Sequence, residues 1–215
     1  MMLDYLVQKP TGQQAKYPAL ILLHGYGSNE QDLFSFAPEL DPDAYVFSLR
    51  APHDMGMGSF AWYAIHFDAD ESKFSDIPQA VASRDLIVET IQQLCAEYPI
   101  DAADITLIGF SQGCILSYAV ALSYPELIRR VVAMSGYFDP KMAVNSFADN
   151  PAIKQLSFFS SHGSSDQVVP VQWGQKAAQT IKDLEIPCVY KEYPVGHGVA
   201  PQNFFDLRDW LMKTK

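Results

Sequence analysis

Residues 104–113 read Asp-Ile-Thr-Leu-Ile-Gly-Phe-Ser-Gln-Gly, and this stretch decides the fold. A short apolar run leads into the pentapeptide 109–113, which has the form G-x-S-x-G, and residues 115–122 beyond it are apolar almost throughout. This order predicts a buried strand, a sharp turn and a buried helix, with the Ser111 hydroxyl lifted above the sheet as a nucleophile. Such a turn presses together the residues two before and two after the serine, and Gly109 and Gly113 are small enough for it. A serine that only caps the next helix is the alternative, and the flanking strand and helix argue against it.

Short apolar runs recur on either side of this turn. They lie at residues 19–23, 45–49, 105–108, 130–134 and 156–160, and Gly, Pro or Asp residues bound them. Runs of this length predict strands that are buried on both faces, as in a parallel sheet. The more polar residues 188–193 suit a last strand near the edge of that sheet.

Helices are predicted between these strands, because apolar residues recur there at helical spacing. The segments are 87–98, 115–122, 173–184 and 203–212. Strands that alternate with helices are typical of an α/β fold. We therefore expect a mostly parallel sheet with helices on both faces.

Length, charge and cysteine content limit the class of protein. The 215 residues contain no repeat or Gly/Ser linker, which favours one domain over residues 1–215. The net charge of −10 makes nucleic acid a poor partner, and no apolar run approaches the roughly 20 residues of a membrane span. The start of the chain does not resemble a signal peptide. Cys95, Cys114 and Cys188 are widely spaced, so they indicate neither a disulfide framework nor a zinc site, and a cytoplasmic protein is expected.

A serine hydroxyl needs a base to accept its proton. Of the five histidines, only His162 and His197 follow Ser111. His197 lies between two glycines in a loop after the last predicted strand, from which it can return over the sheet to the nucleophile. We predict that His197 is the base, and a surface-loop histidine is the alternative.

The base needs a carboxylate that orients its ring and stabilises the imidazolium. Asp166 follows the predicted strand 156–160, so the chain order would be Ser, Asp, His. A turn or helix-capping aspartate is the alternative for it. Asp139 follows the previous strand and could reach the same histidine. Asp166 is preferred because its loop lies next to the strand that delivers His197.

Negative charge on the substrate oxygen needs hydrogen-bond donors that are already in place. The backbone N–H of Gln112, directly after the nucleophile, is one candidate. The other is the backbone N–H of Tyr26, in a glycine-containing loop after the first predicted strand. A simple turn would also explain the glycines of that loop.

Five segments together resemble the α/β-hydrolases, and more narrowly the phospholipase/carboxylesterase family with its acyl-protein thioesterases and small bacterial carboxylesterases. They are residues 23–27 (L-H-G-Y-G), 60–63 (F-A-W-Y), 109–113 (G-F-S-Q-G), 162–170 (H-G-S-S-D-Q-V-V-P) and 196–198 (G-H-G). The resemblance implies an α/β-hydrolase fold without a cap domain, a triad of Ser111, Asp166 and His197, and an oxyanion hole of the Tyr26 and Gln112 amides. It implies no metal and no organic cofactor. Members of the family often dimerise, so a homodimer is among the expected states.

Residues 52–67 do not match the family residue for residue. We expect this loop to wall the acyl pocket, which makes Met57, Phe60 and Trp62 the predicted substrate-binding residues. Packing in the core is the alternative for Phe60 and Trp62.

The sequence thus predicts a serine hydrolase that cleaves carboxylic esters or thioesters of short-to-medium acyl groups through an acyl-enzyme. Without a cap, its site would be an open groove for a small-molecule acyl substrate. A lysophospholipase or a cofactor-free perhydrolase could use the same triad. A non-catalytic ligand-binding protein of the same fold is a further alternative, and the intact Ser, Asp and His argue against it.

Overall fold

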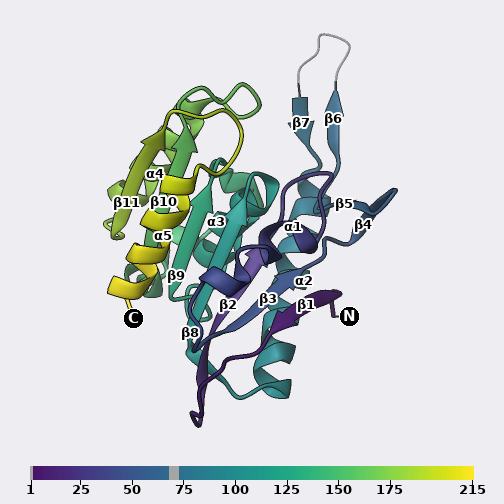
Figure 1. Cartoon of the computed structure of the whole chain (residues 1–215). Helices are drawn as coiled ribbons and strands as arrows, with labels where there is room; N and C mark the ends of the chain where they lie inside the picture. The colour runs from purple at the N-terminus through teal and green to yellow at the C-terminus, as the bar shows by residue number, and fades with distance from the viewer. Residues whose placement is uncertain (1, 68–72) are drawn as a thin grey trace.

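A computed structural model describes residues 2–67 and 73–215, and its centre is a sheet of seven strands (Figure 1). The strand order is β1-β3-β2-β8-β9-β10-β11. The strands are β1 (Tyr5–Gln8), β2 (Tyr17–Leu23), β3 (Tyr45–Leu49), β8 (Ile100–Phe110), β9 (Arg130–Met134), β10 (Ser157–Gly163) and β11 (Cys188–Tyr193). Only β1 is antiparallel to its neighbour in this sheet, so the predicted mostly parallel sheet is confirmed.

Helices cover both faces of the sheet, as predicted (Figure 1). On one face lie α2 (Ile77–Glu97), α3 (Gln112–Ser123) and α4 (Val171–Asp183), whose apolar side chains join the larger core layer. On the other face lie α1 (Gln31–Phe34) and α5 (Pro201–Lys213) with the smaller layer. The central strands are therefore buried from both sides, which explains their nearly unbroken apolar sequences.

Helix α2 begins at Ile77, well before the predicted start at residue 87. Its first turn is fixed by Asp76, whose side chain accepts a hydrogen bond of 3.0 Å from the Gln79 N–H, and by Pro78, which suits a first turn. Ser83 and Arg84 are buried on this part of the helix. Because two of the three buried residues there are polar, hydrophobic spacing alone did not reveal the first three turns.

The connection from β3 to α2 forms two hairpins, which the sequence did not predict. They consist of β4 (His53–Gly56) with β5 (Ser59–Ala61) and of β6 (Ile65–Phe67) with β7 (Lys73–Ser75), and both project from one side of the sheet (Figure 1). The remaining short elements are 3-10 helices, η1 (Ala37–Glu39), η2 (Pro140–Met142), η3 (Phe147–Asp149) and η4 (Pro151–Gln155). Nothing in the described residues conflicts with the expected absence of a cap domain.

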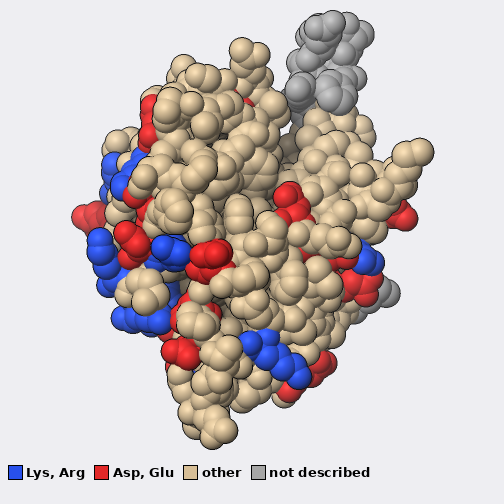
Figure 2. Space-filling model, in the orientation of Figure 1, with Lys and Arg blue, Asp and Glu red and all other residues tan. Residues whose placement is uncertain are grey.

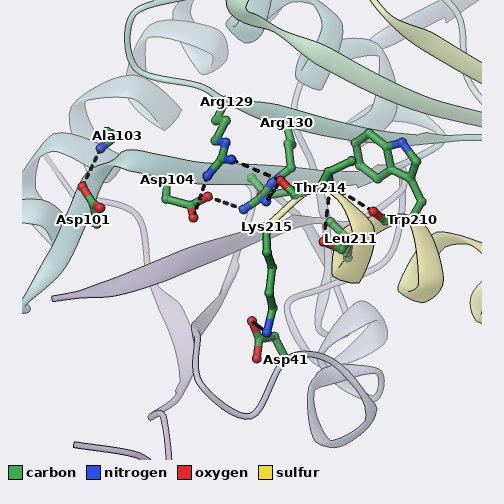
Figure 3. Close-up of polar contacts among 11 residues, drawn as sticks. Asp41, Asp101, Ala103, Asp104, Arg129, Arg130, Trp210, Leu211, Thr214 and Lys215 are labelled. Carbon is green, nitrogen blue, oxygen red and sulfur yellow. Dashed lines mark hydrogen bonds and ion pairs between the residues drawn. The ribbon is translucent and has the colours of Figure 1, made fainter. Parts of the chain in front are cut away.

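An ion-pair cluster connects the end of α5 to β8 and to the start of β9 (Figure 3). Arg129 and Arg130 both pair with Asp104, and both donate hydrogen bonds to the carbonyl oxygen of Thr214, at 3.2 and 2.7 Å. Lys215 pairs with Asp41 at 2.9 Å. Burial lowers the pKa of Arg130 against the effect of Asp104, but a guanidinium stays charged at neutral pH. The cluster therefore holds α5 in place at the amino-terminal ends of the strands.

Charged side chains are unevenly spread over the face in Figure 2. Basic and acidic residues gather on the side of α5 and toward the lower end, whereas the upper part, toward which the strands' carboxyl ends point, is sparsely charged (Figures 1 and 2). Within the described part of the chain, no helix has both the length and the apolar character needed to cross a membrane.

Candidate active site

Ser111 stands at the sharp turn between β8 and α3, with φ of 52° and ψ of −115°. A residue other than glycine seldom adopts a positive φ, and the strain costs on the order of 1–3 kcal/mol. The two flanking glycines permit the turn. A Cβ at Gly109 would lie 2.5 Å from the carbonyl oxygen of Gly113, and a Cβ at Gly113 would lie 2.0 Å from that of Leu23. The chain therefore accepts backbone strain at Ser111, beyond the carboxyl end of the central strand β8.

A chain of hydrogen bonds joins Ser111, His197 and Asp166. His197 Nε2 lies 2.9 Å from Ser111 Oγ, and His197 Nδ1 lies 2.7 Å from Asp166 Oδ2. Because an ionised carboxylate can only accept, Nδ1 carries the hydrogen and Nε2 is free to accept from the serine hydroxyl. The structure thus brings the three predicted catalytic residues together from loops after β8, β10 and β11.

The second carboxylate oxygen of Asp166 is held by the backbone. Oδ1 accepts hydrogen bonds from the N–H groups of Val168 and Val169, at 2.8 and 2.9 Å. Burial acts to raise the pKa of Asp166, but the bonds from His197 and from the two amides outweigh it and hold the pKa below its usual value. Asp166 is therefore ionised and fixed in orientation.

His162 lies beside this carboxylate, and sequence reasoning gave it no role. Its Nε2 donates to the carbonyl oxygen of Val169 at 2.9 Å and lies 3.4 Å from Asp166 Oδ2. The ring is fully buried, and Gly174 leaves room for it, since a Cβ there would lie 2.3 Å from His162 Nδ1. The sequence signal for His162 was its place at the start of the segment 162–170, four residues before Asp166.

Asp139 has a different task. Its side chain caps η2, where Oδ1 accepts a hydrogen bond of 3.0 Å from the Lys141 N–H. No hydrogen bond or ion pair joins it to His197 among the described residues. The geometry therefore favours Asp166 over Asp139 as the partner of His197.

The two predicted oxyanion donors come from different elements, and the loop of Tyr26 passes close to Ser111, since a Cβ at Gly25 would lie 3.4 Å from the Ser111 Cβ. Tyr26 follows β2, and Gln112 is the first residue of α3. The amide of Gln112 is at the N-terminal end of a buried helix, where N–H groups have no helical partner and favour negative charge. The side chain of Gln112 is buried and bonds to the backbone of Trp62 and Tyr63, at 2.8 Å each.

A cavity of about 340 Å³ opens beside Ser111 and His197. Its walls are mostly apolar, and three wall residues, Tyr26, Val168 and Trp173, are also well exposed at its rim. The remaining lining residues are Tyr63, Ile65, Ser75, Gln112, Ile115, Tyr137 and Val169. Sequence reasoning missed most of this wall, although Tyr137 and Trp173 follow the carboxyl ends of β9 and β10, where ligands of α/β sheets bind.

The three predicted substrate-binding residues do not line this cavity. Trp62 is fully buried, and its indole N–H donates to the carbonyl oxygen of His24 at 2.8 Å. Phe60 is half-buried beneath the Arg50 guanidinium, which lies 5.0 Å from its ring centre. Met57 is fully exposed at the β4–β5 turn with φ of 54°. The alternative of core packing therefore describes Trp62, and the cavity wall comes from other elements.

Cys114 follows Ser111 closely but offers no thiolate. It is fully buried, and burial raises the pKa of its thiol, which keeps the sulfur protonated and unreactive. Within residues 2–67 and 73–215, no group of three His, Cys, Asp or Glu side chains could hold a metal ion.

Comparison with known proteins defines the class. The model of the phospholipase/carboxylesterase family matches residues 6–215, so the chain belongs to that family. It is 30% identical to acyl-protein thioesterase 1 of Aspergillus fumigatus over 213 residues, covering 91% of this chain and 87% of the relative. A probable carboxylesterase of Oryza sativa subsp. japonica is 26% identical over 206 residues, covering 89% and 76% of the two chains.

Solved structures agree on the fold. Esterase PE8 superposes with a TM-score of 0.86 at 24% identity and full coverage of both chains. Acyl-protein thioesterase 2 of Zea mays gives a TM-score of 0.80 at 22% identity and covers 98% of each chain. The chain is thus an α/β-hydrolase, and its relatives make it a hydrolase of the carboxylesterase and acyl-protein thioesterase type.

Proposed function

We propose that the protein hydrolyses carboxylic esters or thioesters of short-to-medium acyl groups with Ser111, His197 and Asp166 as a catalytic triad. The observation that carries the proposal is the hydrogen-bond chain from Ser111 Oγ through both ring nitrogens of His197 to Asp166 Oδ2, at 2.9 and 2.7 Å. A serine so connected loses its proton to the imidazole as it attacks.

In the proposed reaction, Ser111 Oγ attacks the acyl carbon while His197 Nε2 takes the hydroxyl proton. Asp166 stabilises the imidazolium that forms. The carbonyl oxygen becomes negatively charged and accepts hydrogen bonds from the amides of Tyr26 and Gln112. His197 then gives its proton to the leaving alcohol or thiol, and the acyl group stays on Ser111. Water, deprotonated by His197, attacks this acyl-enzyme and releases the acid.

The acyl group is proposed to lie in the apolar cavity beside Ser111. Its volume of about 340 Å³ and its aromatic and aliphatic walls support an uncharged chain of limited length. No charged side chain is among the described lining residues apart from His197, if protonated. An acyl chain therefore loses little polar solvation when it enters.

A chain-length profile tests the acyl preference. We expect esters with short-to-medium acyl chains to be hydrolysed faster than emulsified triglycerides, because the cavity is small and open. The measurement is kcat/KM across p-nitrophenyl esters of increasing chain length, with one acyl thioester alongside and a triglyceride emulsion as the comparison. Activity on the emulsion alone would contradict the proposal, and failure of Ser111 to react with a fluorophosphonate would favour a ligand-binding protein.

The pH profile tests His197. Activity is expected to fall on the acid side, because a protonated His197 can no longer accept the Ser111 proton. Asp166 would not cause this loss, since its pKa lies below the usual value and its carboxylate is ionised until the pH is lower still. The measurement is kcat/KM from pH 5 to 8, with circular dichroism to show that the protein stays folded. A flat profile would contradict the role of His197.

We also propose that the chain is one domain and works in the cytoplasm. One sheet and its two apolar layers take in elements from Tyr5 to Lys213, which supports a single domain. The three cysteines are free, as is usual in a reducing compartment.

A further inference from the structure

Residues 60–63, here called the brace segment, bond both to the loop that carries Tyr26 and to Gln112 at the start of α3. The segment begins in β5 and runs toward β6. The side chains of Phe60 and Trp62 do not line the cavity. Its hydrogen bonds instead run to the loop of Tyr26 on one side and to Gln112 on the other.

On the Tyr26 side, the brace segment holds the residues before and after the donor. The indole Nε1–H of Trp62 donates to the carbonyl oxygen of His24 at 2.8 Å. The Gly27 N–H donates to the carbonyl oxygen of Phe60 at 2.9 Å, and the Phe60 N–H donates to that of Ser28 at 2.8 Å. The backbone is thus fixed on both sides of Tyr26.

His24 strengthens this attachment from within the core. Its Nε2 accepts a hydrogen bond of 3.1 Å from the Ala51 N–H, so its Nδ1 carries the hydrogen and lies 2.8 Å from the carbonyl oxygen of Gly25. Burial lowers the pKa of His24, which keeps the ring neutral in this arrangement. The loop therefore has little freedom to move independently of the brace segment.

On the Gln112 side, the attachment is a pair of bonds from one amide side chain. Gln112 Oε1 accepts from the Trp62 N–H, and Gln112 Nε2 donates to the carbonyl oxygen of Tyr63, both at 2.8 Å. Both side chains, Gln112 and Trp62, are buried, so water cannot replace these bonds. The carbonyl oxygen of Trp62 also accepts from the hydroxyl of Ser83 on α2.

We propose that the brace segment is a positioning element that sets the separation and direction of the two oxyanion donors, with Trp62 and the Gln112 side chain as its positioning residues. The proposal rests on the proposed function, because it requires that the Tyr26 and Gln112 amides bind the oxyanion. Donors of this kind act only when they are aimed at the place where negative charge develops. The brace segment supplies this aim because it bonds to the backbone on both sides of Tyr26 and to the side chain of Gln112.

Two variants separate positioning from binding. Trp62→Phe removes the bond to His24 but keeps an aromatic side chain, and Gln112→Met keeps the length of the side chain but removes both bonds to the brace segment. We expect kcat to fall about 10- to 100-fold in each, with KM within about threefold, because removal of an entire oxyanion donor costs about 10²–10³. If Gln112→Met does not fold, Ser83→Ala loosens the same backbone and should lower kcat in the same direction.

The decisive measurement is the ratio of kcat/KM for an ester to that for the matching thionoester, whose sulfur is larger and a poorer acceptor. Wild type should favour the ester strongly, and the variants should lose about as much of this preference as they lose in kcat. The double variant should be no worse than the poorer single variant, because both act on one element. Tyr118→Phe is the matched control. Tyr118 lies on α3 like Gln112, and the change removes its buried hydrogen bond of 2.9 Å to Ser160 on β10, so the ratio should stay unchanged.

The outcomes distinguish a failure of the positioning role from a failure of the proposed function. If wild type prefers the ester strongly and the folded variants keep both that preference and their kcat, the positioning role is wrong and the proposed function stands. If wild type itself shows no more preference than hydroxide does in solution, the oxyanion donors are wrongly assigned and the proposed function fails at that step. If Trp62→Phe and Gln112→Met lose no more kcat than Tyr118→Phe does, the brace segment has only a structural role and the proposal is wrong.

Discussion

Ser111→Ala is expected to lower kcat on a carboxylic ester by at least about 10³-fold while the protein stays folded. The change removes one oxygen, which lies 2.9 Å from His197 Nε2 and at the wall of the cavity. The Ser111 side chain makes no capping bond to α3, so its removal does not weaken the helix. The measurement is steady-state hydrolysis of a p-nitrophenyl ester together with a thermal unfolding curve. Retention of more than a tenth of the rate would exclude Ser111 as the nucleophile.

Ser135→Ala is a matched control for this experiment. Ser135 is also a serine with φ of 52°, and it follows β9 as Ser111 follows β8. Its buried hydroxyl has no hydrogen-bond partner among the described residues. The same loss of one hydroxyl at the same unusual backbone angle should therefore leave kcat within a few-fold of wild type.

Asp166→Asn is expected to lower kcat by about 10³–10⁴-fold. An asparagine at this position can offer its NH₂ group to His197 Nδ1, which would favour the ring tautomer with its hydrogen on Nε2. That tautomer cannot accept the Ser111 proton. The bonds from the Val168 and Val169 amides hold the side chain in place, so the loss comes from the ring and not from a displaced loop. Single-turnover kinetics would report it as slower acylation.

Asp139→Asn gives the paired comparison. Asparagine can still cap η2, because its side-chain oxygen can accept from the Lys141 N–H as Asp139 does. This variant should stay within a few-fold of wild type. The opposite ranking of the two variants in one assay would transfer the carboxylate role to Asp139.

The core of the fold was predictable because its signals are local. The strand, turn and helix around Ser111 follow from the apolar run and the two glycines, and the sequence motif carries that geometry with it. The loops of Asp166 and His197 were found through their order after the strands. Strand β1 was missed because its four residues are only half-buried, as suits an edge strand, and lack a continuous apolar run.

The cavity wall was not predictable, because it is made by tertiary contact. Tyr137, Trp173 and Ile115 come from three separate segments, and nothing in their local sequences says that they share one surface. Trp62 shows the opposite difficulty. An aromatic residue close to a site fits a substrate contact and a core residue equally well, and only its hydrogen bonds to His24 and Gln112 decide between them.

The placement of the three proposed catalytic side chains after β8, β10 and β11 has a consequence for folding. Ser111 and His197 are separated by 86 positions, and β11, which precedes His197, follows β8, β9 and β10 along the chain. Parallel pairing of distant strands is slow, because the intervening chain must be ordered first. A partly folded chain with β8, β9 and β10 in place would have its serine and its carboxylate but no base. Recovery of esterase activity during refolding would therefore report the docking of β11, whereas helix content would recover earlier.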